Sequence, residues 1–302
     1  MEQKTQLSPA GTKAKASPGI HFVLFLTVVI WASTFINIKV VLQQLPPNTI
    51  AFLRFFLAGI ILVFYFRLTG QPGVKREDWL RVGVCGLTGV ALYNFFQNQG
   101  LKYAGATDAA ILASLAPVFM AVLSWLILHE KITGQQIFGI IVAFTGSLLV
   151  ATNGSFRDLA LSSARLWGDF LVFLTGLIWA VYNIALKKLL DRYPPVTVLT
   201  YSTVIGALLL FPCMLFESPQ FGPVNLAGWL NVVYLGLVAS ALAYLLWNKA
   251  LVATSIITAG AYLYLIPVVA GIIAAVFLGE MPGPWLVAGG VLALVGTYFA
   301  GK

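Results

Sequence analysis

Residues 115–130, LAPVFMAVLSWLILHE, recur in a related form at residues 265–280, LIPVVAGIIAAVFLGE. Each stretch has a proline at its third position and a glutamate at its last, so both landmarks are separated by 150 residues. An internal repeat determines the architecture of a chain more directly than a single motif does. The sequence therefore predicts two copies of one structural unit.

The repeat extends over nearly the whole chain. Trp31 and Trp179 lie 148 residues apart, and the change of offset from 148 to 150 indicates that one short loop differs in length. If each unit crosses a membrane an odd number of times, the second is inverted relative to the first, a recurring design of secondary transporters. The other matched pairs are Lys39 and Lys187, Pro46 and Pro194, Gly86 and Gly236, Gly139 and Gly289, and Gly146 and Gly296.

The composition is that of a protein surrounded by lipid. Of the 302 residues, 60% are hydrophobic and 9% are charged, and the mean hydropathy is +0.92, whereas soluble proteins carry about 25% charged residues. The net charge of +8 is spread in short clusters between apolar runs, so we expect no nucleic-acid partner. Cys85 and Cys213 both fall inside apolar segments, and we expect no metal and no cofactor.

The hydropathy pattern predicts an all-α polytopic membrane protein with ten transmembrane helices in two inverted five-helix repeats. A spanning helix needs about 20 mostly apolar residues. We expect a disordered cytoplasmic tail over 1–19, a first repeat over 20–152, a linker over 153–166 and a second repeat over 167–302. The predicted spans are 21–42, 48–68, 79–100, 107–128, 134–152, 167–189, 196–216, 226–250, 256–278 and 283–300.

Basic residues predict the orientation of these spans, because Lys and Arg are enriched in cytoplasmic loops. Thirteen of the 18 Lys and Arg residues fall on the side of the N-terminus when ten spans are counted, and only Lys39, Lys102, Arg157 and Arg165 fall on the other. Arg54 lies within a span. Both termini are therefore expected in the cytoplasm.

Polar residues within the first and sixth spans form matching stripes. Trp31, Thr34 and Asn37 follow one another at helical spacing, and the sixth span carries Trp179 and Tyr182, with Asn183 beside them. Polar groups in hydrocarbon require partners, so these stripes should face the protein interior. They either hold helices together by hydrogen bonds or line a cavity. The mid-span position of both tryptophans favours the cavity.

The third and eighth spans carry a second polar group. Tyr93, Asn94 and Gln97 lie on adjacent turns, and Tyr244 and Asn248 are among their counterparts in the second repeat. These side chains either contact water or a ligand, or form an inter-helix hydrogen-bond ladder.

Arg54 lies about two turns into the second span. Three roles remain open for its guanidinium: it extends to the outer interface, pairs with an internal carboxylate such as Asp108, or binds an anionic ligand. Asp108 alternatively favours the N-terminus of its own helix.

Two matched pairs are interpreted as structural. Glu130 and Glu280 each end a span, and the free N–H groups of the following helix are their expected partners. Pro117 and Pro267 fall in mid-span and should bend their helices, either to permit rocking or as static kinks.

Together these features resemble the EamA family of the drug/metabolite transporter superfamily. The resemblance rests on IWASTF at residues 30–35, the repeated Pro–Glu interval and the glycine-rich fifth and tenth spans. It implies a bacterial inner-membrane carrier that exports small metabolites, often amino acids, from a central cavity by alternating access. The aromatic and amide side chains favour a neutral or zwitterionic solute.

Other functions stay open as alternatives. A carrier of drugs or quaternary amines would belong to the same superfamily. A membrane scaffold or an intramembrane enzyme is disfavoured, since the chain has only two histidines and lacks the His-Glu-x-x-His and Gly-x-Ser-x-Gly strings. We therefore expect no enzyme activity. The expected partners are a small-molecule substrate and the lipid bilayer, and the sequence does not determine an oligomeric state.

Overall fold

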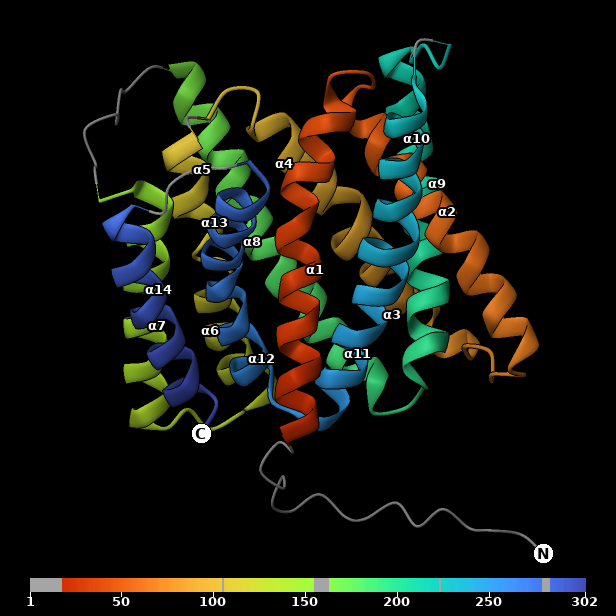
Figure 1. Ribbon diagram of the computed structural model, residues 1–302. Coiled ribbons are helices and arrows are strands. Elements are labelled where there is room, and N and C mark those ends of the chain that lie inside the picture. The colour runs from red at the N-terminus through yellow and green to blue at the C-terminus, as the bar shows by residue number, and fades with distance from the viewer. Residues whose placement is uncertain (1–17, 105, 155–162, 223, 279–282) are drawn as a thin grey trace, which may run out of the picture.

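The computed structural model describes residues 18–104, 106–154, 163–222, 224–278 and 283–302, and in those ranges the regular structure is entirely helical. Nine helical segments among them are long and apolar enough to cross a membrane, and a shorter apolar helix, Pro284–Ala300, completes the set (Figure 1). The prediction of an all-α polytopic membrane protein is confirmed.

The five spans of the first repeat contain nine helical segments. They are α1 (Pro18–Leu42), α2 (Pro47–Leu68), η1 (Arg76–Asp78), α3 (Trp79–Gly86), η2 (Leu87–Leu92), α4 (Tyr93–Gly100), α5 (Ala106–Ala113), α6 (Ala116–Leu128) and α7 (Gly134–Thr152).

The second repeat contains the corresponding spans. They are α8 (Ser163–Leu190), α9 (Pro195–Glu217), α10 (Leu226–Tyr234), η3 (Leu235–Leu242), α11 (Ala243–Ala253), α12 (Ile256–Tyr262), η4 (Leu263–Leu265), α13 (Ile266–Leu278) and α14 (Pro284–Ala300).

The two repeats run in opposite directions. In Figure 1, α1 begins at the lower end of the molecule, where the C-terminus also lies, and rises, whereas α8 begins at the upper end and descends. We call the lower end the termini end and the upper end the opposite end. The inversion follows from the odd number of spans in each repeat.

Two pairs of spans are irregular at matching positions. The third and eighth spans change from α- to π-helix in η2 and η3. The fourth and ninth spans are interrupted just before Pro117 and Pro267, by residues 114–115 and by the short η4. Proline explains the second irregularity, because its ring removes the N–H that would bond to the residue four positions earlier. The predicted span 107–128 is thus two helices, α5 and α6.

Glycine allows α7 and α14 to pack with their backbones in contact. A Cβ atom on Gly146 would lie 2.4 Å from the backbone nitrogen of Ala293, and one on Gly296 would lie 2.2 Å from that of Ala143. Both distances are below any tolerated contact, so only glycine fits. Close approach of this kind is a main source of helix association in lipid, where no hydrophobic force acts between spans.

The second spans of the two repeats, α2 and α9, are joined at the opposite end by one carboxylate. Glu217, the last residue of α9, accepts hydrogen bonds from the backbone nitrogens of Asn48 and Thr49, at 3.1 and 2.7 Å, and from the Thr49 hydroxyl at 2.9 Å. These are free N–H groups in the first turn of α2, where the helix dipole also favours a negative charge.

Candidate functional site

Aromatic side chains from both repeats meet in the middle of the molecule. Trp31 of α1 has its ring centroid 5.6 Å from Trp179, 5.5 Å from Tyr244 and 5.3 Å from Trp247. Edge-to-face and tilted contacts at this separation are the favourable geometries for aromatic rings. The full aromatic cluster comprises Trp31, Tyr93, Trp179, Tyr182, Tyr244 and Trp247.

The two π segments supply polar contacts to this cluster. Trp31 Nε1 donates to the carbonyl of Ala239 in η3 at 3.3 Å, and the Tyr244 hydroxyl lies 3.5 Å from the carbonyl of Gly89 in η2. Residues 89 and 239 are repeat equivalents, at the offset of 150. A Cβ on Gly89 would lie 2.4 Å from the ring of Tyr182, so glycine is required there. Single-turn π segments are frequent at functional sites.

Arg54 reaches the same region from α2. Its Nε donates to Ser240 Oγ in η3 at 2.8 Å, and its guanidinium carbon lies 5.1 Å from the ring centroid of Phe55. The Phe55 ring in turn lies 5.8 Å from the ring of Tyr244, between centroids. Among the described side chains no carboxylate lies within ion-pair distance of Arg54. The guanidinium is therefore directed toward η3, in the middle of the eighth span. The predicted pairing with Asp108 is not tested, because the side chain of Asp108 lies outside the described residues.

Most polar side chains of the predicted stripes bond to their own helix. Thr34 Oγ1 donates to the carbonyl of Trp31 at 2.6 Å, Asn37 to that of Ser33 and Asn94 to that of Val90. Such backbonding satisfies the polar groups locally and leaves the hydroxyl or amide oxygens available.

Asn183 connects the sixth span to the eighth. Its Nδ2 donates to the carbonyl of Trp179 at 2.8 Å, and its Oδ1 accepts from Trp247 Nε1 at 2.8 Å. Gln97 lies one turn after Tyr93 in α4. Seven of the predicted candidate residues thus lie around one centre in the structure. They are Trp31, Arg54, Tyr93, Trp179, Tyr182, Asn183 and Tyr244.

Asn248 is fully buried, and its amide nitrogen and oxygen both lack a hydrogen-bond partner among the described residues. Its repeat equivalent Asn98 donates to Asn48 Oδ1 at 3.1 Å. The position that corresponds to Asn48 in the second repeat is Val196, which offers no acceptor. The asymmetry explains why this amide is unpaired. A buried orphan amide is costly and is normally satisfied by water or a ligand.

Lysines at equivalent positions of the two repeats have different surroundings. Lys187 of α8 is buried and its ammonium donates to the carbonyls of Leu251 and Thr254, the latter at 2.9 Å, at the end of α11. Lys39, its equivalent in α1, is exposed and makes no hydrogen bond or ion pair with any described residue. Its corresponding acceptors would be the carbonyls of Leu101 and Ala104.

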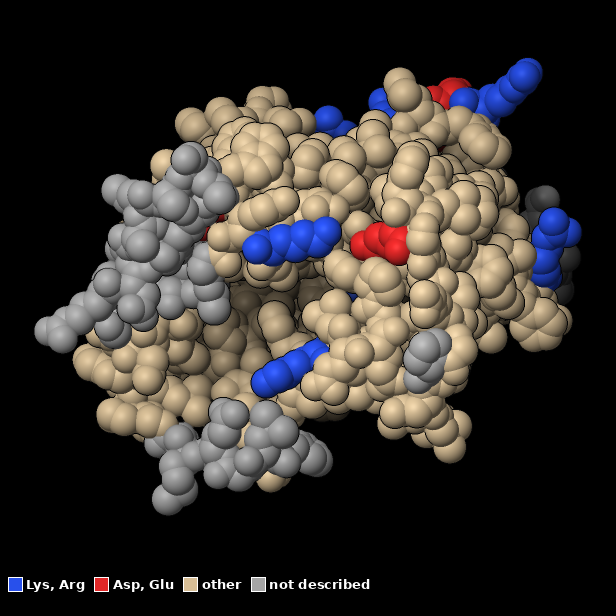
Figure 2. Space-filling view, turned by 90° about the horizontal axis from the view of Figure 1, so that it is seen from above, with Lys and Arg blue, Asp and Glu red and all other residues tan. Residues whose placement is uncertain are grey.

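The helices are also closed at one end and open at the other. At the termini end α6 packs against α12, whereas the equivalent pair at the opposite end, α13 and α5, is not packed together in the described residues. Figure 2, a view onto the opposite end, shows a central hollow with basic side chains at its rim. The hollow therefore lies at the end where α5 and α13 are not packed together in the described residues (Figure 2).

Of the two glutamates interpreted as structural, the structure describes Glu130. The Glu130 carboxylate accepts from Ser124 Oγ at 2.6 Å, in the helix that it follows. The N-terminus of α7, which was expected to bind Glu130, has its own capping box of Thr133 and Gln136. Glu280 lies outside the described residues.

Sequence reasoning did not identify Ser240 or the carbonyls of residues 89 and 239. An isolated serine in an apolar run carries no signal, and a backbone carbonyl has no side-chain signature. The repeated small residues at positions 89 and 239 were the available signal.

Comparison with known proteins identifies the family of the chain. The model of the EamA-like transporter family matches residues 18–152 and 166–301. A probable terminal-alkyne amino-acid exporter of Streptantibioticus cattleyicolor is 33% identical, over 91% of this chain and 90% of its own length. A transporter of Archaeoglobus fulgidus is 34% identical, over 92% and 96%.

A more distant relative and a solved structure extend the comparison. A probable amino-acid metabolite efflux pump of Salmonella typhimurium is 28% identical, over 92% of this chain and 93% of its own length. One crystal structure is 22% identical and superimposes with a TM-score of 0.80, covering 93% of this chain and 96% of that one, which shows a shared fold. The two family matches coincide with the two inverted repeats, and the chain belongs to the EamA-like transporter family.

Proposed function

We propose that this protein exports a small zwitterionic metabolite of the amino-acid class across the bacterial inner membrane by alternating access, with both termini in the cytoplasm. The observation that carries the proposal is Arg54, which lies beside the aromatic cluster and has no carboxylate partner among the described side chains. The names of two relatives, an amino-acid exporter and an amino-acid metabolite efflux pump, support the substrate class.

The chemistry of the centre suits such a solute. A guanidinium has five N–H donors, and Ser240 occupies only the one on Nε, so the two terminal nitrogens can bind a carboxylate in bidentate fashion. The faces of Trp31 and Tyr244 attract an ammonium group through the ring quadrupole. The other rings of the aromatic cluster would contact an apolar side chain of the solute.

The two lysines support alternating access. In an inverted repeat the second conformation is reached when the two halves exchange roles about a fixed site. Lys187 holds α8 to the end of α11 and thereby closes the termini end. In the other conformation Lys39 would bind the carbonyls of Leu101 and Ala104 and close the opposite end, while Lys187 would release its acceptors.

The distribution of charge supports the orientation. The described part of the chain carries most of its Lys and Arg at the termini end, as a cytoplasmic face does. The hollow then opens away from the cytoplasm (Figure 2), so the conformation described here is the one that releases an exported solute.

A quaternary-amine or drug carrier is the second candidate, because the aromatic cluster alone could bind such a cation. The two functions differ in their need for Arg54. An amino acid requires the guanidinium, whereas it would repel a cation that lacks a carboxylate.

Counterflow in proteoliposomes distinguishes amino-acid transport from amine transport. Vesicles loaded with phenylalanine, or with phenethylamine, which lacks only the carboxylate, are assayed for uptake of the labelled solute. We expect exchange of the amino acid and not of the amine. Arg54→Gln should raise the half-saturating concentration at least about 10-fold, since hydrogen bonds to charged groups contribute about 1.5–3 kcal/mol. Arg67→Gln, an exposed arginine on the same helix, is the matched control.

Two results would contradict the proposal. Exchange of the amine with unchanged kinetics in Arg54→Gln would assign the protein to amine transport. Absence of counterflow for every amino acid and amine, with the protein folded and inserted, would remove the carrier function for this class of solute.

A further inference from the structure

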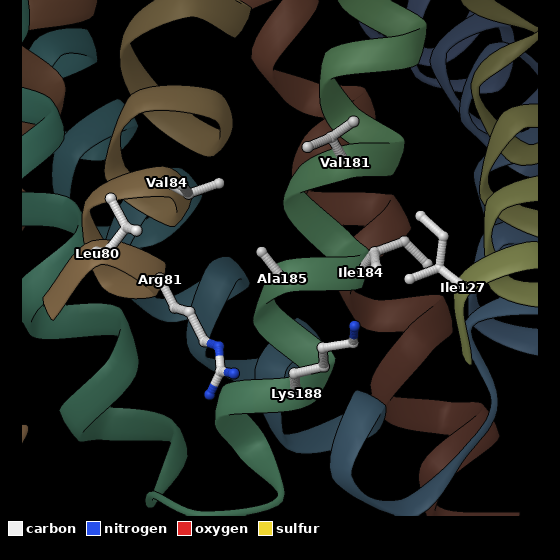
Figure 3. A pocket seen from close by; sticks show the side chains of 8 residues that line it. All are labelled: Leu80, Arg81, Val84, Ile127, Val181, Ile184, Ala185 and Lys188. Carbon is white, nitrogen blue, oxygen red and sulfur yellow. The ribbon is translucent and has the colours of Figure 1, made fainter. Parts of the chain in front are cut away.

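A groove on the lipid-facing side of the molecule lies at the termini end, apart from the central site. It has a volume of about 280 Å³ and is formed by the third, fourth and sixth spans. Helices α3 and α6 both pack against α8 but, in the described residues, not against each other, so α8 is the floor. The lining residues are Leu80, Arg81, Val84, Ile127, Val181, Ile184, Ala185 and Lys188 (Figure 3).

The upper part of the groove is apolar and open to the bilayer. Leu80 is 81% exposed, Ile127 44% and Val181 37%, although all three are large hydrophobic residues. Exposed apolar surface on a membrane protein faces acyl chains. A linear apolar segment that lies along α8 between α3 and α6 would cover it.

The lower part of the groove carries two cations. Figure 3 shows Arg81 on α3 and Lys188 on α8 at the end of the groove that is nearest to the termini end, below the apolar side chains. Lys188 is exposed and makes no hydrogen bond or ion pair with a described residue. The Arg81 side chain is 52% exposed, and its Nη1 is held by Asp78 at 2.9 Å.

Two carboxylates beside Arg81, those of Glu77 and Asp78, are already engaged. Asp78 is fully buried and also binds Arg192 Nη1 at 2.7 Å and the Tyr193 hydroxyl at 2.8 Å. Glu77 is paired with Arg192. These contacts orient Arg81, and Lys188 has no ion pair with any described carboxylate.

The repeat equivalents of these two cations, toward the opposite end, are uncharged. At the offsets of the repeat, Arg81 corresponds to Asn231 and Lys188 to Val40. The repeat thus preserves the helices but not the cations, so the groove differs between the two leaflets by its charge.

We propose that this groove binds one anionic phospholipid of the cytoplasmic leaflet. One acyl chain lies on α8 between α3 and α6, and the phosphate lies between Arg81 and Lys188. Basic pockets between spans on the cytoplasmic side are suited to anionic headgroups, and each Lys or Arg near the surface contributes to such attraction. A free phosphate could bind the same two cations, but only a lipid also has an acyl chain to cover the apolar half of the groove.

Photocrosslinking of the full-length protein tests the proposal. The protein is placed in phosphatidylcholine nanodiscs that contain a few per cent of phosphatidylglycerol with a diazirine on its acyl chain, and crosslinked peptides are identified by mass spectrometry. We expect crosslinks on α3, α6 and α8 at the groove. An equal crosslink yield from diazirine-labelled phosphatidylcholine would overturn the selectivity for anionic lipid.

Two variants and one control make the test specific. Lys188→Gln should lower the yield at the groove about fivefold, because one basic residue contributes about 1 kcal/mol. Ala185→Trp should block the acyl chain while both cations remain. Lys249→Gln, an exposed lysine near the same end that does not line the groove, should leave the yield unchanged. An unchanged yield in folded Lys188→Gln overturns the proposal whether or not the tryptophan variant folds.

Competition distinguishes the lipid from a soluble phosphate. Glycerol 3-phosphate at millimolar concentration should leave the crosslink yield unchanged, because it has no acyl chain to cover the apolar half of the groove. Full displacement by glycerol 3-phosphate would show a phosphate site and refute the binding of lipid.

Discussion

Replacing Lys187 with methionine should open the termini end of the protein. Methionine keeps much of the apolar stem but removes the ammonium that donates to the carbonyls of Leu251 and Thr254. A hydrogen bond to a charged group contributes about 1.5–3 kcal/mol. Loss of both, partly offset by water that enters on opening, should lower the stability of the closed end by about 3 kcal/mol. The ratio of the two conformations would then change by about 100-fold.

The assay is labelling of a single cysteine by a membrane-impermeant maleimide. Thr254→Cys, in a background with both native cysteines replaced, has its side chain buried in the present conformation. The backbone carbonyl that accepts from Lys187 is retained in this variant. The reagent is applied to the termini face in inside-out vesicles. We expect a much higher labelling rate when Lys187→Met is added.

Lys39→Met is the matched control, because Lys39 is proposed to close the opposite end, and only in the second conformation of the transport cycle. It should leave labelling of Thr254→Cys unchanged or lower it. The reasoning is refuted if Lys187→Met, with unaltered thermal stability, leaves the labelling rate unchanged, or if both lysine variants change it in the same direction.

Three further predictions concern packing, capping and the aromatic cluster. Gly146→Ala should lower the free energy of unfolding by about 1–3 kcal/mol, because the added methyl group would overlap the backbone of α14. The measurement is a thermal melt in detergent. In that melt Gly134→Ala should behave as the parent protein, because nothing lies within 4 Å of its added methyl group. Glu217→Gln should cost about 1–2 kcal/mol in a denaturant titration, because a neutral amide binds the first turn of α2 more weakly; an unchanged midpoint would contradict the role of its charge. Trp31→Ala should abolish counterflow in a folded protein, whereas Trp125→Ala, a ring exposed to lipid, should retain it; normal flux in the first variant would exclude Trp31 from the site.

Local properties of the sequence were sufficient to predict the spans. A spanning helix satisfies its backbone hydrogen bonds internally, so its presence depends on about 20 consecutive residues and not on distant ones. The offsets between Trp31 and Trp179 and between Pro117 and Pro267 then indicated the repeat, and the odd number of spans required its inversion. Because a polar side chain within a span must face the interior, Arg54 and the mid-span tryptophans were also identifiable as candidates.

The partners of those residues depend on how helices far apart in sequence are rotated and shifted against each other. Ser240 receives Arg54 because η3 turns its hydroxyl toward α2, and Trp31 finds the Ala239 carbonyl in the same π segment. No residue type marks these contacts, since a π segment changes register without a sequence signature of its own. Likewise, Lys39 and Lys187 are equivalent in the sequence, but only the packing of the spans determines which one is bound and which one is exposed. Composition and periodicity thus determined the spans and their inversion, because both act over one helix, while the centre and the closed end required contacts between helices.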